Sequence, residues 1–132
     1  MDTFQTMQIP SKRTGVALDG SDVRLLLQLK GGGAAHFELA SGETSIAVAH
    51  RTVDEIWHII GGRGEMWRKL GDAEETVGLE MGICLTIPVG THFQWRSVGT
   101  HPLAAIGVNM PPWPGEEEAY RVEGMWKPTV ES

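Results

Sequence analysis

Five histidines and one cysteine are the residues of this sequence best suited to proton transfer, nucleophilic attack or metal binding. An imidazole exchanges protons near neutral pH and is the commonest protein ligand of transition metals. Cys84 lies in an apolar run with no basic neighbour to activate it, so we expect a buried, unreactive thiol. Whether an imidazole can take part in such chemistry depends on the strand or turn that carries it. The histidines are His36, His50, His58, His92 and His101.

Short runs of β-favouring residues, separated by glycine-containing turns, follow one another through most of the chain. The turn signals include Gly31-Gly32-Gly33 and Gly61-Gly62. No window has a sustained helical period with capping residues, so an all-β sandwich or barrel of antiparallel strands is predicted. The predicted strands cover residues 23–29, 34–40, 45–50, 55–60, 63–70, 75–79, 83–88, 93–97 and 103–110.

The 132 residues fit one domain, 1–132, which is large enough to bury a core. Residues 1–22 are polar and rich in turn residues, and are predicted to be an edge strand or an arm that reaches a partner subunit. Residues 23–110 are the predicted barrel. Residues 111–132 are a C-terminal extension that begins Pro-Pro-Trp-Pro-Gly, which excludes a central strand. The acidic run 116–118 is predicted to open a short helix or to be a solvated face, and the rest to be an extended tail.

The charge balance excludes some partners. The formal net charge is −6, from 11 basic and 17 acidic residues, and no Lys/Arg cluster is long enough to follow a phosphate backbone. Nucleic acid is therefore not an expected partner, and an acidic protein is disfavoured on anionic membranes. The N-terminus has no signal-peptide arrangement and no apolar stretch approaches the length of a membrane span, so we expect a cytoplasmic protein.

Two segments, 42–62 and 82–97, resemble the two conserved motifs of the cupin superfamily. The first family motif is Gly, five residues, His-x-His, three or four residues, Glu, six residues, Gly. The second is Gly, five residues, Pro-x-Gly, two residues, His, three residues, Asn. Every spacing fits, and the matching residues are Gly42, His50, Glu55, Gly62, Gly82, Pro88 and Gly90. The resemblance implies a double-stranded β-helix, or jelly-roll, barrel.

The departures from the motifs fall at the metal ligands. In metal-binding cupins, two histidines and the glutamate of the first motif and the histidine of the second hold one divalent ion. Val48 and Phe93 occupy two of these slots, and Ser97 replaces the asparagine. His50 and Glu55 remain as candidate ligands of one divalent transition metal, and two protein ligands rarely hold a metal well.

The other histidines are weaker candidates for completing such a site. His92 precedes the expected slot by one residue, so strand alternation points it to the opposite face unless a bulge intervenes. The register of His36 is open. Alternation sends His58 outward, and His101 starts a turn and is most simply a surface residue.

With the family register as a frame, alternation along the strands predicts which side chains point into the barrel. His50 and Glu55 would then lie in an apolar, aromatic cavity, either as a catalytic acid–base couple or as a buried hydrogen bond between two polar groups. Trp57 and Trp95 are either a stacking wall for a flat ligand or core filling. The predicted substrate-binding residues are Val48, Trp57, Phe93 and Trp95.

The resemblance implies a small enzyme that acts on a small organic molecule in the cavity, by His/Glu acid–base chemistry or through a weak metal site. The alternative is a non-catalytic barrel that binds a small molecule, like the sensor domains of some regulators. A third reading is a barrel filled by its own side chains that serves in assembly. A homodimer is also expected, since many small cupins pair through their N-terminal strands.

Overall fold

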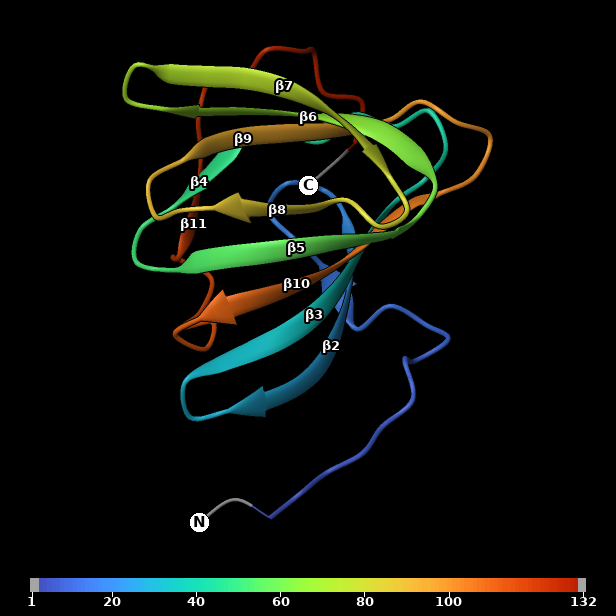
Figure 1. Cartoon of the computed structure of the whole chain (residues 1–132), viewed down its shortest axis with the longest axis vertical. Helices are drawn as coiled ribbons and strands as arrows, with labels where there is room; N and C mark the ends of the chain where they lie inside the picture. Colours follow the sequence, from blue (N-terminus) through green and yellow to red (C-terminus); the bar gives the residue numbers. More distant parts are fainter. Residues whose placement is uncertain (1–2, 131–132) are drawn as a thin grey trace.

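The chain forms two antiparallel sheets that face each other, as seen in a computed structural model that describes residues 3–130 (Figure 1). One sheet has the strand order β1-β2-β3-β10-β5-β8 and the other β11-β4-β9-β6-β7. The described part contains strands and no helix. The strands are β1 (Gly15–Val16), β2 (Asp22–Leu29), β3 (Gly32–Leu39), β4 (Val48–His50), β5 (Asp54–Gly61), β6 (Arg63–Leu70), β7 (Ala73–Glu80), β8 (Cys84–Ile87), β9 (His92–Ser97), β10 (Leu103–Met110) and β11 (Ala119–Arg121).

The all-β prediction is confirmed, and every predicted strand is present with bounds close to those expected. The N-terminal region contributes the two-residue strand β1 at the edge of its sheet. Two local features differ from the predictions. The acidic run 116–118 is a turn rather than a helix, and it leads into the unpredicted strand β11.

The Cys84 thiol is exposed, contrary to the expectation from its apolar neighbours. The reason is the alternation of β8, in which Leu85 and Ile87 are buried while Cys84 and Thr86 face solvent. A three-residue apolar run does not reveal which of its members lies on the solvent side.

The glycines that carry the motif spacing all lie at bends that only glycine adopts freely. Gly42, Gly62, Gly82 and Gly90 have φ angles of 82°, 81°, 94° and 83°. At Gly62 a Cβ atom would also collide with the backbone of Pro102. The intervals between these glycines therefore record where the chain must turn between strands.

Strand alternation builds the core between the sheets. In β5, Glu55, Trp57 and Ile59 are buried, whereas Asp54, Ile56 and His58 face outward. The same pattern in β10 buries Leu103 and Ala105. The core continues through Leu39, Met66, Leu79, Leu85, Ile87, Phe93 and Trp95.

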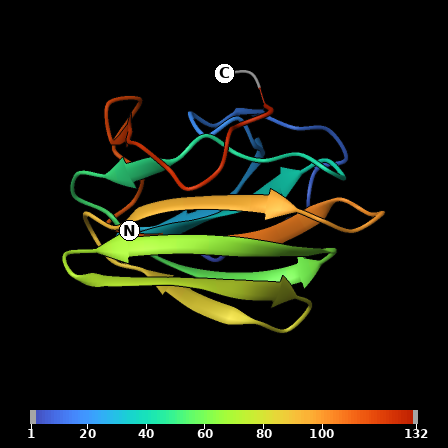
Figure 2. The same cartoon turned by 90° about the horizontal axis from the view of Figure 1, so that it is seen from above.

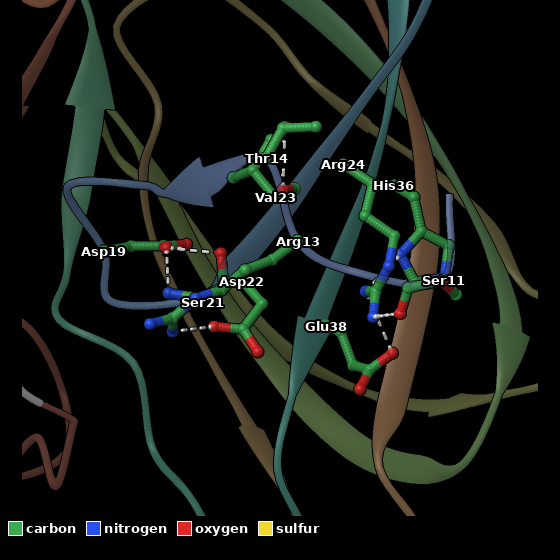
Figure 3. Close-up of polar contacts among 10 residues, drawn as sticks. All are labelled: Ser11, Arg13, Thr14, Asp19, Ser21, Asp22, Val23, Arg24, His36 and Glu38. Carbon is green, nitrogen blue, oxygen red and sulfur yellow. Dashed lines mark hydrogen bonds and ion pairs between the residues drawn. The ribbon is translucent and has the colours of Figure 1, made fainter. Parts of the chain in front are cut away.

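The segment before β1 leaves the body of the barrel as an extended arm (Figure 1). Arg24 of β2 anchors its end by donating hydrogen bonds to the backbone carbonyls of Pro10 and Ser11 (2.9 and 3.3 Å; Figure 3 shows the bond to Ser11). Further out, Phe4 is fully exposed and Met7 and Ile9 are also exposed. Within residues 3–130, none of the chain forms a helix long and apolar enough to cross a membrane.

The C-terminal segment returns across the second sheet, running beside β4 (Figure 2). Strand β11 pairs with β4, with Ala119 opposite His50. Further along, the buried Gln94 side chain accepts hydrogen bonds from the backbone N–H groups of Met125 and Trp126 (both 2.9 Å). The tail is thus attached to the barrel.

Candidate functional site

A cavity of about 660 Å³ lies between the two sheets, within the size range of small-molecule pockets. Residues of β1, β2, β3, β5 and β10 line one side. Residues of β4, β9, β11 and the turn after β10 line the other. The lining therefore draws on nearly the full length of the chain.

Stacked aromatic rings form one wall of the cavity. The rings of Phe37 and Trp57 stack with their centroids 5.1 Å apart and their planes 18° apart. Gly107 of β10 lies opposite Trp57, and a Cβ atom there would come within 2.6 Å of Phe37 and 3.0 Å of Trp57. The absence of a side chain at Gly107 therefore makes room for the stacked pair, which offers a flat apolar surface to a ring-shaped ligand.

Glu55 projects from β5 into the cavity and is 2% exposed. Its Oε1 accepts a hydrogen bond from the Trp57 indole Nε1 (2.9 Å), and its Oε2 has no partner among the described residues. Burial raises the pKa of Glu55 to about 7; the indole hydrogen bond opposes the rise, and nearby Asp19 and Glu118 add to it. Near neutral pH this carboxyl group exists in both protonation states.

His50 reaches the cavity from β4 in the opposite sheet. The rings of Phe93 and Trp113 both pack against the imidazole in T-shaped, edge-to-face contacts. Their centroids lie 5.3 and 5.0 Å from the imidazole centroid. Burial lowers the pKa of His50 to about 4, although the Glu118 carboxylate opposes the change. The imidazole is therefore neutral at pH 7. Its Nδ1 is buried without a hydrogen-bond partner in the part of the chain described.

A mutual hydrogen bond between His50 and Glu55 was one of the alternatives expected from the sequence. The structure instead leaves His50 Nδ1 and Glu55 Oε2 both unpaired. Buried polar atoms are nearly always bonded, so two that are free at one cavity indicate groups available to a bound molecule.

Asn109 and Asp19 are two polar cavity residues that sequence reasoning missed. Asn109, on β10, is 6% exposed and its Oδ1 lacks a partner within residues 3–130. Asp19 accepts hydrogen bonds from the backbone N–H and hydroxyl of Ser21 (2.9 and 2.7 Å; Figure 3) and from the Trp95 indole (3.0 Å). Burial raises the pKa of Asp19, against these hydrogen bonds. Strand alternation places Asn109 on the same inward face as Ala105 and Gly107, and this alternation could have identified it as a cavity residue from the sequence.

Glu118 holds the turn that joins the strand of His50 to the strand of Glu55. Its carboxylate accepts hydrogen bonds from the backbone N–H groups of Thr52 and Val53 (2.7 and 2.9 Å) and from the Thr52 hydroxyl (2.6 Å). Burial raises the pKa of Glu118, but these hydrogen bonds more than offset the rise, so its pKa lies below the usual value. The C-terminal segment thereby fixes the turn that lies between His50 and Glu55.

The residues present do not fit the metal site that the resemblance implies. Within the described chain, no group of three or more His, Cys, Asp or Glu side chains is arranged to hold a metal ion. Val48 and Phe93 stand opposite each other on β4 and β9, and the Phe93 ring packs on His50. Hydrocarbon therefore occupies the places of two ligands, and His50 and Glu55 alone make a poor donor set.

The structure brings together five of the six residues predicted to point into the barrel: Val48, His50, Glu55, Trp57 and Phe93 line the cavity. Trp95 is fully buried behind Trp57, with centroids 4.8 Å apart, and is not part of the lining. The catalytic, substrate-binding and metal roles assigned to these residues stay predictions.

The remaining histidines lie away from the cavity lining. His36 is buried on the outer side of β3, near the Arg24 guanidinium (3.5 Å from Nδ1; Figure 3). Burial and the positive charge of Arg24 lower the pKa of His36. His58 and His101 are exposed. His92 is half-buried and pairs with Lys69 across the sheet.

No known family profile matches the sequence, and no curated protein is similar to it. Solved structures match its fold. One is a Klebsiella pneumoniae protein described as an uncharacterized conserved protein with a double-stranded β-helix domain; it is 16% identical, has a TM-score of 0.65, and the match covers 82% of this chain and 89% of that one. The chain has the cupin fold.

Two larger proteins contain a similar cupin fold. Bacillus subtilis oxalate decarboxylase is 14% identical with a TM-score of 0.71, and the match covers 85% of this chain and 30% of that one. The Staphylococcus aureus capsular polysaccharide assembling protein CapF is 19% identical with a TM-score of 0.65, covering 80% of this chain and 33% of that one. At these identities the likeness concerns the fold alone.

Proposed function

We propose that this cupin-fold protein binds a small organic molecule in the cavity and moves a proton on it with Glu55, assisted by His50, without a metal ion. The observation that carries the proposal is the set of buried, unpaired polar atoms on one aromatic cavity: Glu55 Oε2, His50 Nδ1 and Asn109 Oδ1. Such atoms are costly in a folded protein unless a ligand or an ordered water bonds to them, and a ligand that replaces the water gains these hydrogen bonds.

The two titratable groups suit proton transfer. A carboxyl group with a pKa of about 7 is a base and an acid of comparable strength at neutral pH, which is the best condition for general acid–base catalysis. The neutral imidazole of His50 offers a hydrogen bond to a substrate oxygen or nitrogen without adding charge. In an isomerisation, Glu55 gives its proton to one substrate atom and the resulting carboxylate takes a proton from another, or the two steps occur in the reverse order, so no oxidant or reductant is consumed.

A ligand screen followed by isotope exchange tests this function. Molecules that raise the melting temperature are incubated with the protein in D₂O, and NMR follows deuterium entering carbon-bound positions of the ligand or its isomerisation. The wild type should catalyse exchange, and Glu55→Gln should reduce the rate at least about 100-fold, which is the lower range for a general base. Glu80→Gln, on the exposed surface of β7, is the matched control and should behave as wild type. Equal exchange by wild type and Glu55→Gln would refute the assignment of Glu55.

Metal analysis separates this proposal from the weak metal site. Protein purified without chelator, and protein challenged with Fe(II), Mn(II), Ni(II) or Zn(II), should retain no stoichiometric metal, and chelator should not slow exchange. Stoichiometric metal that His50→Ala removes, together with metal-dependent turnover, would overturn the metal-free mechanism. Tight ligand binding without exchange in any ligand would favour the non-catalytic, sensor-like alternative.

A further inference from the structure

Glu55 and Asn109 are direct neighbours across two paired strands. Strands β5 and β10 are antiparallel, and Asn109 is the register partner of Glu55. Residues directly opposite in such a pair point to the same face, with about 5 Å between their Cβ atoms. Both side chains line the cavity, and each has one buried oxygen without a partner in the described chain: Glu55 Oε2 and Asn109 Oδ1. The cavity therefore presents two polar atoms side by side.

A glycine on the other neighbouring strand, β3, leaves room for the Asn109 side-chain amide. Gly33 of β3 is the register partner of Asn109 on the other side, and a Cβ atom at Gly33 would lie 3.2 Å from Asn109 Oδ1. That approach is closer than ordinary van der Waals contact, so any larger residue would press on the amide oxygen. Because Gly33 has no side chain, the Asn109 amide can stay next to Glu55 on the cavity wall.

The two oxygens have opposite hydrogen-bonding roles. Asn109 Oδ1 is a carbonyl oxygen and only accepts. The Oε1 of Glu55 already accepts from the Trp57 indole, and the charged groups that bear on this carboxyl, Asp19 and Glu118, are acidic, so they favour its neutral form. A neutral carboxylic acid with one oxygen accepting carries its proton on the other, and Glu55 Oε2–H donates. One donor and one acceptor therefore stand next to each other.

We propose that the cavity recognises a flat, uncharged ring compound that carries a lactam edge, with the ring carbonyl accepting from Glu55 and the adjacent ring N–H donating to Asn109. The stacked rings of Phe37 and Trp57 supply the apolar surface for the body of the ligand. Three acidic side chains, Asp19, Glu55 and Glu116, line the cavity beside one basic side chain, Arg121, so this lining disfavours an anionic ligand. This inference rests on the proposed function, since it names the substrate class for the same cavity.

Calorimetric titration of the full-length chain with three bicyclic probes tests the recognition. The probes are 2-quinolinone, its N-methyl derivative and quinoline-2-carboxylate. The wild type should bind 2-quinolinone, bind the N-methyl compound at least about tenfold more weakly because Asn109 Oδ1 then stays unpaired, and not bind the carboxylate. Preference for the carboxylate, or equal affinity for the two quinolinones, would overturn the lactam assignment.

Variants assign the two hydrogen bonds. Asn109→Leu removes the acceptor and should bind both quinolinones with similar affinity. Glu55→Gln keeps a donor in the form of an amide N–H, so it should retain 2-quinolinone binding within about threefold while losing proton exchange. An unchanged ratio between the quinolinones in Asn109→Leu would refute the role of Asn109. Loss of all binding in a folded Glu55→Gln would refute the donor role of Glu55.

A glycine substitution provides a second probe that removes no polar group. Gly33→Ala should weaken 2-quinolinone binding, because the new methyl group displaces the Asn109 amide, whereas Gly31→Ala meets no atom within 4 Å and should not. Equal binding by these two variants would contradict the positioning described above. Failure of every quinolinone to bind, with turnover of another ligand by Glu55, would refute the lactam class and leave the proposed function standing.

Discussion

At the scale of single residues, Glu55 and His50 are buried groups whose pKa values move in opposite directions. Folding raises the pKa of Glu55 from 4.5 to about 7. Between these two pH values the folded protein therefore holds more protons than the unfolded chain. Its contribution to stability therefore falls as pH rises through this window. Folding lowers the pKa of His50 from 6.5 to about 4. The contribution of His50 to the stability of the fold therefore falls as pH decreases from 6.5 to 4. The two dependences overlap and largely cancel in the wild type.

Single substitutions should expose each half of this balance. The free energy of unfolding of Glu55→Gln, relative to wild type, should increase by about 3 kcal/mol from pH 4.5 to 7, since about 1.4 kcal/mol corresponds to one pKa unit. That of His50→Asn, relative to wild type, should increase by a similar amount as pH falls from 6.5 to 4. Urea unfolding across this pH range measures both. Curves that stay parallel to wild type would show that neither group is shifted.

A second residue-scale prediction concerns Gly107, where the stacked aromatic rings leave no room for a side chain. Gly107→Ala should destabilise the fold by about 1–3 kcal/mol, the usual cost of overpacking a core. It should also displace Trp57 and change the near-ultraviolet circular dichroism. Gly78→Ala on β7 meets no atom within 4 Å and is the matched control. A Gly107→Ala protein as stable as this control would contradict the close packing.

At the scale of elements, the turn between β4 and β5 depends on a residue from the far end of the chain. Glu118→Ala removes the acceptor of the Thr52 and Val53 N–H groups and should destabilise the protein by about 1–3 kcal/mol. Ligand affinity should fall as well, because His50 and Glu55 flank this turn. Glu117→Ala is the control, since the Glu117 side chain is exposed and the bond that Glu117 accepts from Arg51 is made by its backbone carbonyl, which the substitution keeps. Chemical denaturation would measure the loss of stability and calorimetry the loss of ligand affinity. Identical results for the two variants would contradict the role of Glu118 in holding this turn.

The strands and the part of the cavity lining on β4, β5 and β9 were predictable because the relevant signals are local. Glycine spacing marked the bends, and alternation placed Glu55 and Trp57 on one face of their strand. The partnership of Asn109 with Glu55 was not predictable in this way, because it depends on which strands pair across 54 residues of sequence separation. The contacts of Trp113 and Glu118 lie in a segment without periodicity, where no pattern indicates which residue reaches the barrel.

At the scale of the whole molecule, the N-terminal arm exposes apolar side chains that are not among the core residues of the barrel. Phe4, Met7 and Ile9 are exposed along an extended segment whose anchoring contacts, from Arg24 and at Arg13 and Thr14, lie nearer to β1. We predict that the arm packs on a second copy, so that light scattering finds one species of twice the chain mass. The double substitution of Phe4 and Met7 by Ser should shift the equilibrium toward single chains. A wild type that remains at single-chain mass at all concentrations would contradict the homodimer.

The hydrogen bonds between residues 52 and 118 also set the order in which the protein can mature. Synthesis proceeds from the N-terminus, and early parts of a chain begin to fold while later parts are still being made. The backbone groups of Thr52 and Val53 must wait for an acceptor that is translated 65 or more residues later. The turn that separates His50 from Glu55 on the cavity wall is therefore anchored only after residue 118 has been made. A message truncated before codon 118 would yield nascent chains in which the turn between His50 and Glu55 has no anchor.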